Sequence, residues 1–446
     1  MSISPARVAA YEILLRVERG DAYSSELLHA PKYAKLSSVD HGLATELVMG
    51  VLRWHPLLDS RIAAHSSQKL DRLDLEVLTA LRIAAYQLIF FDRVPQHAAV
   101  NESVELVKRA RKRSAVPFAN ALLRKLARGE TKVPDIAIAG DAAALSEASA
   151  HPRWLVDRWV QAFGIEQVRK ICEHNQRTPE TSLRISDPAI EAELQREGVT
   201  LGPGRLLTSA RRVISSEITQ TKSFRSGRVA IQDEGSQLVA LLVGRGSRIL
   251  DCCAAPGGKT RIFAERDPSA TIVAVELHPQ RARLMRRLGT EANVRIIAAD
   301  ARTLPLTAHF DRVLVDVPCS GTGTLARNPE IKWRLRPPDE NSGLLDLQHK
   351  QIEILQSAMQ RVALGGKLVY STCSLEPEEN QQVIEKVLGA SSGFRLVNCR
   401  EELERLRREK ELIGPDLDSL LSGPYLRTLP GVHPCDGFFA AILEMI

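Results

Sequence analysis

The stretch GSRILDCCAAPGGKT, from Gly246 to Thr260, combines a short apolar strand, a glycine-rich turn and the first residues of a helix. Further runs rich in Val, Ile and Leu follow it at helix-length intervals: ATIVAVELH, VRIIAADA, FDRVLVDVPCSG and GGKLVYSTCS. Short buried strands that alternate with helices are typical of a parallel sheet covered on both faces. The spacing therefore predicts an α/β, Rossmann-like domain over residues 227–446, with its ligand site at the carboxyl ends of the strands.

Segments of different pattern precede this domain, so the chain is predicted to be multidomain. Residues 1–130 carry apolar residues at helical spacing, as in LATELVMGVLRW, and are predicted to form an all-α bundle. Residues 131–150 show little periodicity, which indicates a linker. In residues 151–226, the runs TSLRIS, AIEAELQREG and ARRVIS predict strand, helix and strand within a small α+β module.

The composition indicates where in the cell the protein is expected and which kinds of structural site it is expected to lack. The chain has 446 residues, a net charge of +6 and no apolar run of the roughly 18 residues needed to cross a membrane. Its N-terminus lacks the apolar core and cleavage site of a secretory signal peptide. The seven cysteines include no Cys-x-x-Cys pair, which argues against a disulfide framework or a structural zinc site. We expect a cytoplasmic monomer with no metal and no membrane partner.

The glycine-rich turn is expected to bind a cofactor. A P-loop needs Gly five positions before the Gly-Lys pair, where this chain has Cys253, and the dinucleotide fingerprint G-x-G-x-x-G is also absent. Acidic residues end successive strands, first Asp251, then Glu276 and Asp300. Acidic groups and glycines that allow close approach suit a cationic ligand with a ribose. We therefore predict S-adenosylmethionine as cofactor, with S-adenosylhomocysteine as its product.

Two cysteines stand at the ends of further strands. LVDVPCSGTGT places Asp316 and Cys319 at one strand end, and Cys373 closes the next major strand. Two thiols facing this cofactor suit methylation of cytosine at carbon 5. A thiolate that adds to carbon 6 makes carbon 5 nucleophilic, and a base must then remove the proton of carbon 5 so that the thiolate can leave. Asp316 is placed to stabilise the protonated ring near nitrogen 3 and the exocyclic amine.

These motifs resemble those of the RNA (cytosine-5) methyltransferases, specifically the Sun/Fmu-type bacterial 16S rRNA enzymes. The resemblance rests, in order along the chain, on AIQDEGSQ, CAAPGGKT, DVPCSGTGT, RNPEIKW, STCSLEPEEN and DGFFAAIL. PARVAAYEILLRV and VPQHAAVNESVELVKR resemble the NusB-like RNA-binding helical domain that distinguishes this branch. The resemblance implies a NusB-like bundle, an RRM-like middle module and a class I S-adenosylmethionine-dependent methyltransferase domain.

The resemblance also implies roles for single residues. Cys373 would be the nucleophile, and Cys319 would assist proton removal and release. DNA cytosine-5 enzymes use the Pro-Cys cysteine as nucleophile, so Cys319 is the competing candidate for that role. Glu276 departs from the Asp that is common at its position, by one methylene. The implied cofactor-binding residues are Cys253, Ala254, Ala255, Pro256, Gly257, Gly258, Lys259, Glu276, Asp300 and Asp316.

Positive charge concentrates in the helical segment. Residues 1–130 carry 19 Lys and Arg residues against 14 Asp and Glu residues, a net of +5. Five of the six residues from Lys108 to Arg113 are basic, which favours a phosphate-binding patch, with a solvated helix end as the alternative. The candidate RNA-binding residues are Lys108, Arg109, Arg111, Lys112 and Arg113.

The predicted partner is 16S rRNA with a single-stranded or flipped cytosine, because a base inside a duplex cannot reach an enzyme thiol. The same chemistry on tRNA is the alternative among enzymes. A non-catalytic RNA-binding or antitermination scaffold is the alternative of another class, and it would need neither the two cysteines nor the cofactor turn.

Overall fold

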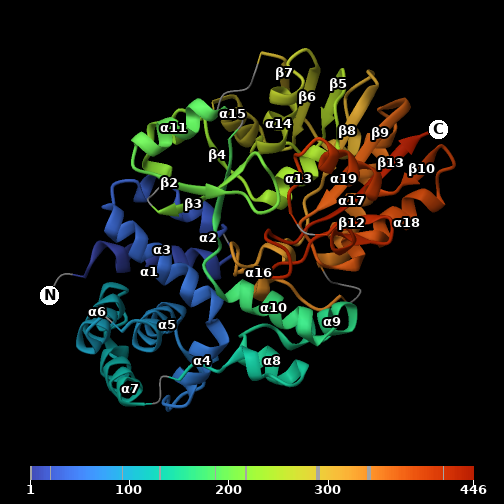
Figure 1. Ribbon diagram of the computed structural model, residues 1–446. Helices are drawn as coiled ribbons and strands as arrows, with labels where there is room; N and C mark the ends of the chain where they lie inside the picture. The colour runs from blue at the N-terminus through green and yellow to red at the C-terminus, as the bar shows by residue number, and fades with distance from the viewer. Residues whose placement is uncertain are drawn as a thin grey trace. The chain divides into compact units, whose positions relative to one another are not determined.

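The computed structural model describes residues 3–20, 22–92, 94–129, 132–185, 187–215, 218–287, 292–338, 343–414 and 416–446. The chain forms two compact units (Figure 1). Residues 1–178 and 325–334 make the first unit, and residues 179–324 and 335–446 make the second. None of the helices in the described part of the chain has the length and apolarity that a bilayer crossing requires.

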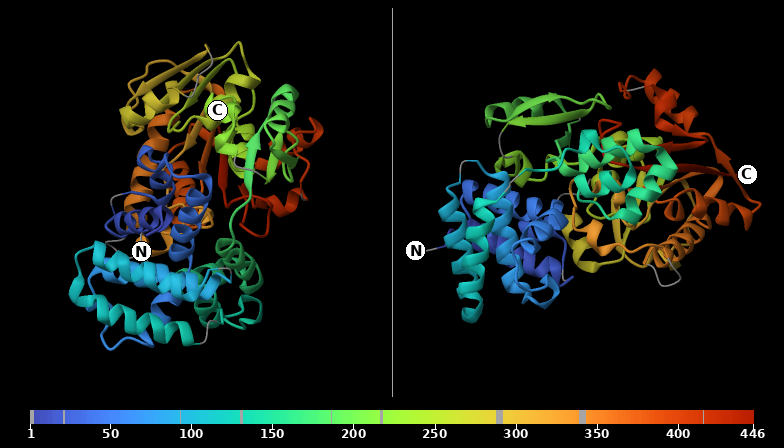
Figure 2. Two further views of the ribbon diagram at one scale, coloured as in Figure 1. Left: turned by 90° about the vertical axis from the view of Figure 1, so that its left-hand side faces the viewer. Right: turned by 90° about the horizontal axis from the view of Figure 1, so that it is seen from below.

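The first unit is helical, as the sequence predicts for the N-terminal segment. Its central helix is α5, whose residues from Val77 to Leu88 are all buried and which contacts α1, α3, α4, α6 and α7. A helix that is apolar all round belongs in a core. Helices α5, α6 and α7 pack side by side (Figure 2). The helices of this unit are α1 (Pro5–Glu18), α2 (Ser24–Leu28), α3 (Ser38–Arg53), α4 (His55–Ala63), α5 (Leu75–Phe90), α6 (Gln96–Arg109), α7 (Val116–Arg128), α8 (Ala142–Ala148), α9 (Arg153–Phe163), α10 (Ile165–Gln176) and α16 (Ile331–Arg334).

The stretch expected to be a linker contains a helix. Helix α8 lies within residues 131–150, and its N-cap Asp141 accepts a hydrogen bond from the backbone N–H of Ala144 at 2.8 Å. Helices α9 and α10, which the sequence assigns to the middle module, belong to the same compact unit as the bundle. The predicted border at residues 130 and 131 lies outside the described residues. The domain limits read from the sequence stay a prediction.

Residues 325–334, the RNPEIKW region, belong to the helical unit although they are distant in sequence. Lys332 is fully buried, and its Nζ donates to the carbonyls of Arg53 at 2.9 Å and Ala150 at 3.1 Å. The carboxylate of Glu330 accepts from the backbone N–H of Ser24 at 2.7 Å and from its hydroxyl at 3.0 Å. A segment inserted into the sequence of the second unit therefore completes the packing of the first.

The second unit begins with a small four-stranded antiparallel sheet in the order β2-β3-β1-β4. Its elements are β1 (Thr181–Arg184), α11 (Pro188–Arg196), β2 (Thr200–Pro203), β3 (Ala210–Ser215), α12 (Lys222–Arg225) and β4 (Ala230–Ile231). The predicted strand, helix and strand correspond to β1, α11 and β3. Strand β2, TLGP, contains Gly and Pro, which disfavour a strand, and β4 has only two residues, so neither was expected from the sequence.

The large sheet of this unit has the strand order β11-β12-β13-β9-β8-β5-β6-β7, with β10 paired to β13. Strands β7, β6, β5, β8 and β9 are parallel and correspond to the five predicted strands. The sheet is mixed rather than wholly parallel, because β13 runs antiparallel to β9 and to its other neighbours. The strands are β5 (Arg248–Asp251), β6 (Thr271–Glu276), β7 (Val294–Ala298), β8 (Phe310–Asp316), β9 (Val362–Thr372), β10 (Phe394–Val397), β11 (Leu421–Ser422), β12 (Tyr425–Arg427) and β13 (Phe439–Met445).

Each face of this sheet has its own core, because successive side chains of a strand point to opposite faces. Ile249 and Leu314 belong to the cluster that contains residues of α13, α14 and α19. Leu250 and Val313 belong to the cluster that contains residues of α17 and α18. The predicted two-sided cover is confirmed. The helices are α13 (Glu234–Leu242), α14 (Gly258–Arg266), α15 (Pro279–Arg287), α17 (Gly343–Met359), α18 (Gln381–Gly389) and α19 (Cys399–Arg408).

Candidate active site

The strand order creates a crevice between β5 and β8. From β5 the chain builds outward through β6 and β7, then returns to β8 on the other side of β5 and continues to β9. Ligands of such sheets bind at this switch point, outside the carboxyl ends of the strands. Asp251 and Asp316 end the two strands there, beside a cavity of about 210 Å³. The cavity is lined by Ile231, Gln232, Asp233, Ser236, Asp251, Cys253, Ala254, Ala255, Pro256, Gly258, Lys259 and Asp316.

The glycine-rich turn forms one wall of this cavity. Gly257 has φ +107°, a conformation that side chains with a Cβ rarely adopt, so glycine is required at this position. A Cβ on Gly258 would lie 3.3 Å from the amide carbon of Gln232. The glycine-rich turn is therefore close to the segment that joins β4 to α13. Gln232, Asp233 and Ser236 all come from the AIQDEGSQ motif, to which sequence reasoning assigned no site role.

Asp251 is a buried carboxyl group in this cavity, with one oxygen engaged and one free. Its Oδ2 accepts from the Thr260 hydroxyl at 2.6 Å, whereas Oδ1 has no hydrogen-bond partner among the described residues. Burial raises the pKa of Asp251 to about 7. An unpartnered buried acceptor suits a ligand donor such as an amino group. The sequence showed Asp251 at a strand end but did not place it among the site residues.

Glu276 and Asp300 stand at the ends of the next two strands of the sheet. Glu276 is buried and accepts from the backbone N–H of Ala255 at 3.3 Å and of His278 at 2.9 Å, so it contacts the glycine-rich turn. Asp300 pairs with the Arg302 guanidinium at 2.7 Å, and this hydrogen bond lowers the pKa of Asp300. Glu276 therefore contacts the glycine-rich turn, whereas Asp300 is paired with Arg302.

Asp316 is held from two sides. Its Oδ2 lies 2.6 Å from the Nζ of Lys259, and its Oδ1 accepts from the Ser371 hydroxyl at 2.6 Å. Burial alone would lower the pKa of Lys259, but the Asp316 carboxylate outweighs it and raises that pKa. The cavity therefore contains a fixed ammonium–carboxylate pair that joins the glycine-rich turn to strands β8 and β9.

The two cysteines that are predicted to be catalytic contact each other. The Sγ atoms of Cys319, after β8, and Cys373, after β9, are 3.2 Å apart. The backbone N–H of Gly323 donates to the carbonyl of Cys373 at 2.9 Å, and the carbonyl of Gly323 accepts from Gly437 at 2.8 Å. A Cβ on Gly323 would lie 2.2 Å from the Gly437 oxygen, so only glycine allows the loop after Cys319 to approach this closely.

The surroundings of Cys319 disfavour its thiolate. The hydrogen bond with Cys373 and burial raise the pKa of the Cys319 thiol well above its ordinary value, and the nearby Glu379 carboxylate adds to the effect. Four of the other five cysteines differ from this pair because they are buried: Cys172, Cys252, Cys399 and Cys435. Cys253 is partly exposed and lines the cavity beside the glycine-rich turn.

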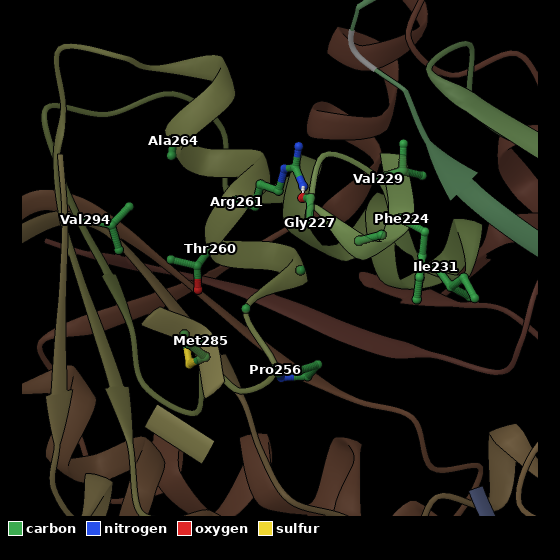
Figure 3. Close-up of a pocket in the computed structure, with 13 residues that line it drawn as sticks. Phe224, Gly227, Val229, Ile231, Pro256, Thr260, Arg261, Ala264, Met285 and Val294 are labelled. Carbon is green, nitrogen blue, oxygen red and sulfur yellow. Dashed lines mark hydrogen bonds between the residues drawn. The ribbon is translucent and has the colours of Figure 1, made fainter. Parts of the chain in front are cut away.

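A second cavity, of about 270 Å³, lies along α14 (Figure 3). Its lining is mostly apolar and includes Phe224, Met285 and Val294. Its polar groups are engaged, because Thr260 donates to Asp251 and the Arg261 guanidinium donates to backbone carbonyls. A nucleoside with an amino acid chain needs polar partners, so the cavity at the switch point suits it better. Within the described residues, no cluster of His, Cys, Asp and Glu side chains could hold a metal ion.

The basic run of the helical unit extends from the end of α6 into the following turn. Lys108 pairs with Glu105 at 2.6 Å, Arg109 with Glu12 at 3.4 Å and Lys112 with Asp74 at 3.0 Å. Lys108, Arg109 and Arg113 line one surface hollow. Arg111 adopts φ 63°, an uncommon value for a residue with a side chain. The geometry brings three of the five candidates together, and part of their charge is already paired.

Comparison with known proteins gives matches over the whole chain. The family model 16S rRNA methyltransferase RsmB/F matches residues 239–444, the NusB family matches residues 4–128, and the Methyltr_RsmF/B-like, ferredoxin-like domain matches residues 151–212. A relative from Bacillus subtilis, named probable ribosomal RNA small subunit methyltransferase B, is 33% identical, with 98% of each chain covered. Ribosomal RNA small subunit methyltransferase B of Vibrio cholerae is 32% identical, covering 99% of this chain and 98% of its own. The crystal structure of PH0851 shares the fold, with a TM-score of 0.79 at 23% identity, and covers 100% of this chain and 99% of its own.

Proposed function

Because the chain belongs to the 16S rRNA methyltransferase RsmB/F family, we propose that it methylates carbon 5 of a cytosine in 16S rRNA through a covalent cysteine–RNA adduct. The observation that carries this proposal is the contact of two thiols, 3.2 Å apart, at the carboxyl ends of neighbouring strands. Methyl transfer to an amino or hydroxyl group needs no thiol nucleophile. Methyl transfer to carbon 5 of a pyrimidine does, because a thiolate must first add to carbon 6.

The cavity at the switch point is proposed to bind S-adenosylmethionine, which would supply the methyl group. Asp251 offers a free buried acceptor for the amino group of its amino acid chain. Gly257 and Gly258 allow close approach of the turn, and Glu276 is held against that turn with its carboxylate directed by two backbone N–H groups. The proposed binding set contains residues 253–259, Glu276, Asp300 and Asp316, and we add Asp251 because it lines the same cavity.

Cys373 is proposed as the nucleophile. It attacks carbon 6 of the ring as a thiolate, while Cys319, whose surroundings disfavour ionisation, keeps its proton. Asp316 is proposed to hold nitrogen 3 and the exocyclic amine, since its carboxylate is already oriented by Lys259 and Ser371. Attack by the thiolate places negative charge on nitrogen 3, which takes a proton from solvent, and the Asp316 carboxylate accepts a hydrogen bond from the resulting ring N–H.

Cys319 is proposed as the base that removes the carbon 5 proton after methylation. The largest cause of its raised pKa is the hydrogen bond with Cys373, and the charge of Cys373 also contributes. Both are weakened once the Cys373 sulfur is bonded to carbon 6, so ionisation of Cys319 becomes easier at the step that needs a base. Cys319 first releases its own proton to solvent; the carbon 5 proton then moves to the Cys319 thiolate, the carbon–sulfur bond breaks, and Cys373 leaves as a thiolate.

Bisulfite sequencing of 16S rRNA and tRNA tests the substrate directly. Cells with the gene should show a protected cytosine in 16S rRNA that cells without it lack, and a plasmid carrying Cys373→Ala should not restore it. Protection that depends on the gene in tRNA alone would move the activity to the alternative substrate. If neither RNA changes, the methylation proposal is wrong.

A further inference from the structure

Glu379 is a fully buried acid that the proposed chemistry does not use. It lies at the end of the short turn Pro377–Glu379 that follows β9, and its side chain has no exposed surface. Its backbone carbonyl accepts from the Tyr370 hydroxyl at 2.6 Å, which ties the turn back to the strand. Acidic residues are almost never fully buried unless they are paired, so this position needs an explanation.

The carboxylate of Glu379 bonds the residue that follows each cysteine. Its Oε1 accepts from the backbone N–H of Ser320, next to Cys319, at 2.8 Å. Its Oε2 accepts from the hydroxyl of Ser374, next to Cys373, at 2.5 Å, and from the Ser320 hydroxyl. One side chain therefore spans the two loops that carry the thiols.

A further contact joins Glu379 to the residue that precedes Cys319 in the chain. The Nε2 of Gln351, on α17, donates to the Oε1 of Glu379 at 2.9 Å and to the carbonyl of Pro318 at 3.1 Å. Glu379 thus has four donors, all of them neutral. A carboxylate can accept from all four, because it has two oxygens with two lone-pair sites each. Burial raises the pKa of Glu379, and the four donors oppose that rise.

We propose that Glu379 is a positioning residue that holds together the loops after β8 and β9, so that the sulfurs of Cys319 and Cys373 stay in contact. The role in catalysis rests on the proposed function, but the positioning itself does not. The Gly323–Cys373 backbone hydrogen bond does not involve Glu379, and neither does the bond from the Leu375 backbone N–H to the Thr322 hydroxyl at 2.8 Å, so the loops keep these connections when the carboxylate is removed.

Two substitutions distinguish the effect of losing the hydrogen bonds of Glu379 from the effect of losing its negative charge. Glu379→Gln keeps an oxygen for Ser320 N–H and Gln351, and its amide can donate to the two serine hydroxyls, which rotate to accept. Glu379→Ala removes all four hydrogen bonds that the carboxylate accepts. The exposed Glu385, on α18, provides the matched control Glu385→Ala.

Disulfide formation between Cys319 and Cys373 measures their contact without RNA or cofactor. The full chain is treated with diamide, a diazene that takes two electrons and two protons from the thiol pair and becomes the hydrazine. The disulfide peptide is then quantified by mass spectrometry. We expect Glu379→Ala to form it at least tenfold more slowly than the wild type. Glu379→Gln should stay within about threefold of the wild type, and Glu385→Ala should not change the rate.

Equal rates for Glu379→Ala and the wild type would overturn the proposal, because the sulfurs would then meet without the carboxylate. If Glu379→Ala does not fold, the double variant Ser320→Ala/Ser374→Ala removes the hydroxyl donors and keeps Glu379. It should slow the disulfide severalfold, and an unchanged rate would also overturn the proposal. A chain that methylates no cytosine but shows the expected disulfide rates would refute the proposed function and leave the positioning role intact.

Discussion

Asp251 is expected to make cofactor binding depend on pH through its own protonation. Its pKa of about 7 means that it is largely neutral below that pH and carries charge above it. If its carboxylate pairs with the ammonium of S-adenosylmethionine, affinity should rise with pH between 5.5 and 7.5, approaching roughly tenfold per unit below pH 7. Calorimetry at several pH values measures this dependence.

The variant Asp251→Asn removes the titrating group and keeps the shape. Its affinity should be weaker than wild type at pH 7.5 and nearly constant across the same range. A wild-type affinity that does not change with pH would exclude Asp251 as the partner of the ammonium group.

Glu276 is expected to bind the cofactor through its carboxylate, which two backbone N–H groups already orient. Glu276→Ala should weaken binding of S-adenosylmethionine by about 1–3 kcal/mol, the cost of losing a buried hydrogen bond. Asp418→Ala, on an exposed carboxylate that pairs with Arg400, is the control and should leave affinity unchanged. Equal affinities for the two variants would remove Glu276 from the site.

At the residue scale, strand ends could be read from the sequence but contacts between them could not. Asp316, Cys319 and Cys373 each follow an apolar run, which indicates a strand end. The 3.2 Å contact of the two sulfurs depends on β8 and β9 being neighbours, and sheet order is a long-range property. Glu379 gave no signal, because an acid in EPEEN reads as a solvated helix start.

Residues 325–334 place polar side chains at the ends of helices in the helical unit. Lys332 bonds the carbonyl of Arg53 at the end of α3, and Glu330 bonds the N–H of Ser24 at the start of α2. The Glu330 carboxylate matches the positive end of the α2 dipole, and the Lys332 amine donates a hydrogen bond to the last carbonyl of α3. The sequence could not predict this, since a ten-residue excursion from one unit into the packing of another leaves no periodic pattern.

Lys332 should make the helical unit more stable as the pH rises. Burial lowers the pKa of Lys332 from 10.5 to about 7. Between these values the unfolded chain binds a proton that the folded unit does not, so the free energy of unfolding increases with pH, by on the order of 1 kcal/mol per unit. The contribution is constant below pH 7 and above pH 10.5.

Tryptophan fluorescence isolates this effect, because Trp54, Trp154, Trp159 and Trp333 all lie in the helical unit. Urea denaturation at pH 7, 8 and 9 should show stability rising in the wild type relative to Lys332→Met. The exposed Lys69, as Lys69→Met, is the control and should follow the wild type. Parallel pH profiles for the wild type and Lys332→Met would contradict a neutral buried amine.

At the scale of the whole molecule, the basic run should bind phosphates without reading sequence. Neutralising Lys108, Arg109, Arg111 and Lys112 to Gln should weaken RNA binding and flatten its dependence on salt, by up to roughly 0.7 in log–log slope for each phosphate that is no longer neutralised. The control neutralises four exposed or partly exposed bases on and beside α19: Arg395, Arg400, Arg408 and Lys410. An unchanged slope for the first variant would favour a solvated helix end.

Most of the architecture followed from the pattern of the sequence. The helical N-terminal segment, the strand–helix–strand core of the middle module and the five parallel strands were predicted and are present. The antiparallel edge from β10 to β13 was not, because a run such as FFAAIL fits a strand or a buried helix equally well and its pairing is long-range. The helix α8 was missed because Ala-rich sequence without apolar periodicity resembles a linker.

Covalent trapping on a denaturing gel distinguishes the proposed roles of the two cysteines, in which Cys373 forms the bond to RNA and Cys319 releases it. The enzyme is mixed with S-adenosylmethionine and 16S rRNA from cells that lack the gene, then run on a denaturing gel. Cys319→Ala should give a protein–RNA band, because the methylated adduct cannot lose its carbon 5 proton. Cys373→Ala and the double variant should give none. A band with Cys373→Ala and none with Cys319→Ala would reverse the two roles, and the absence of a band from both would contradict the account.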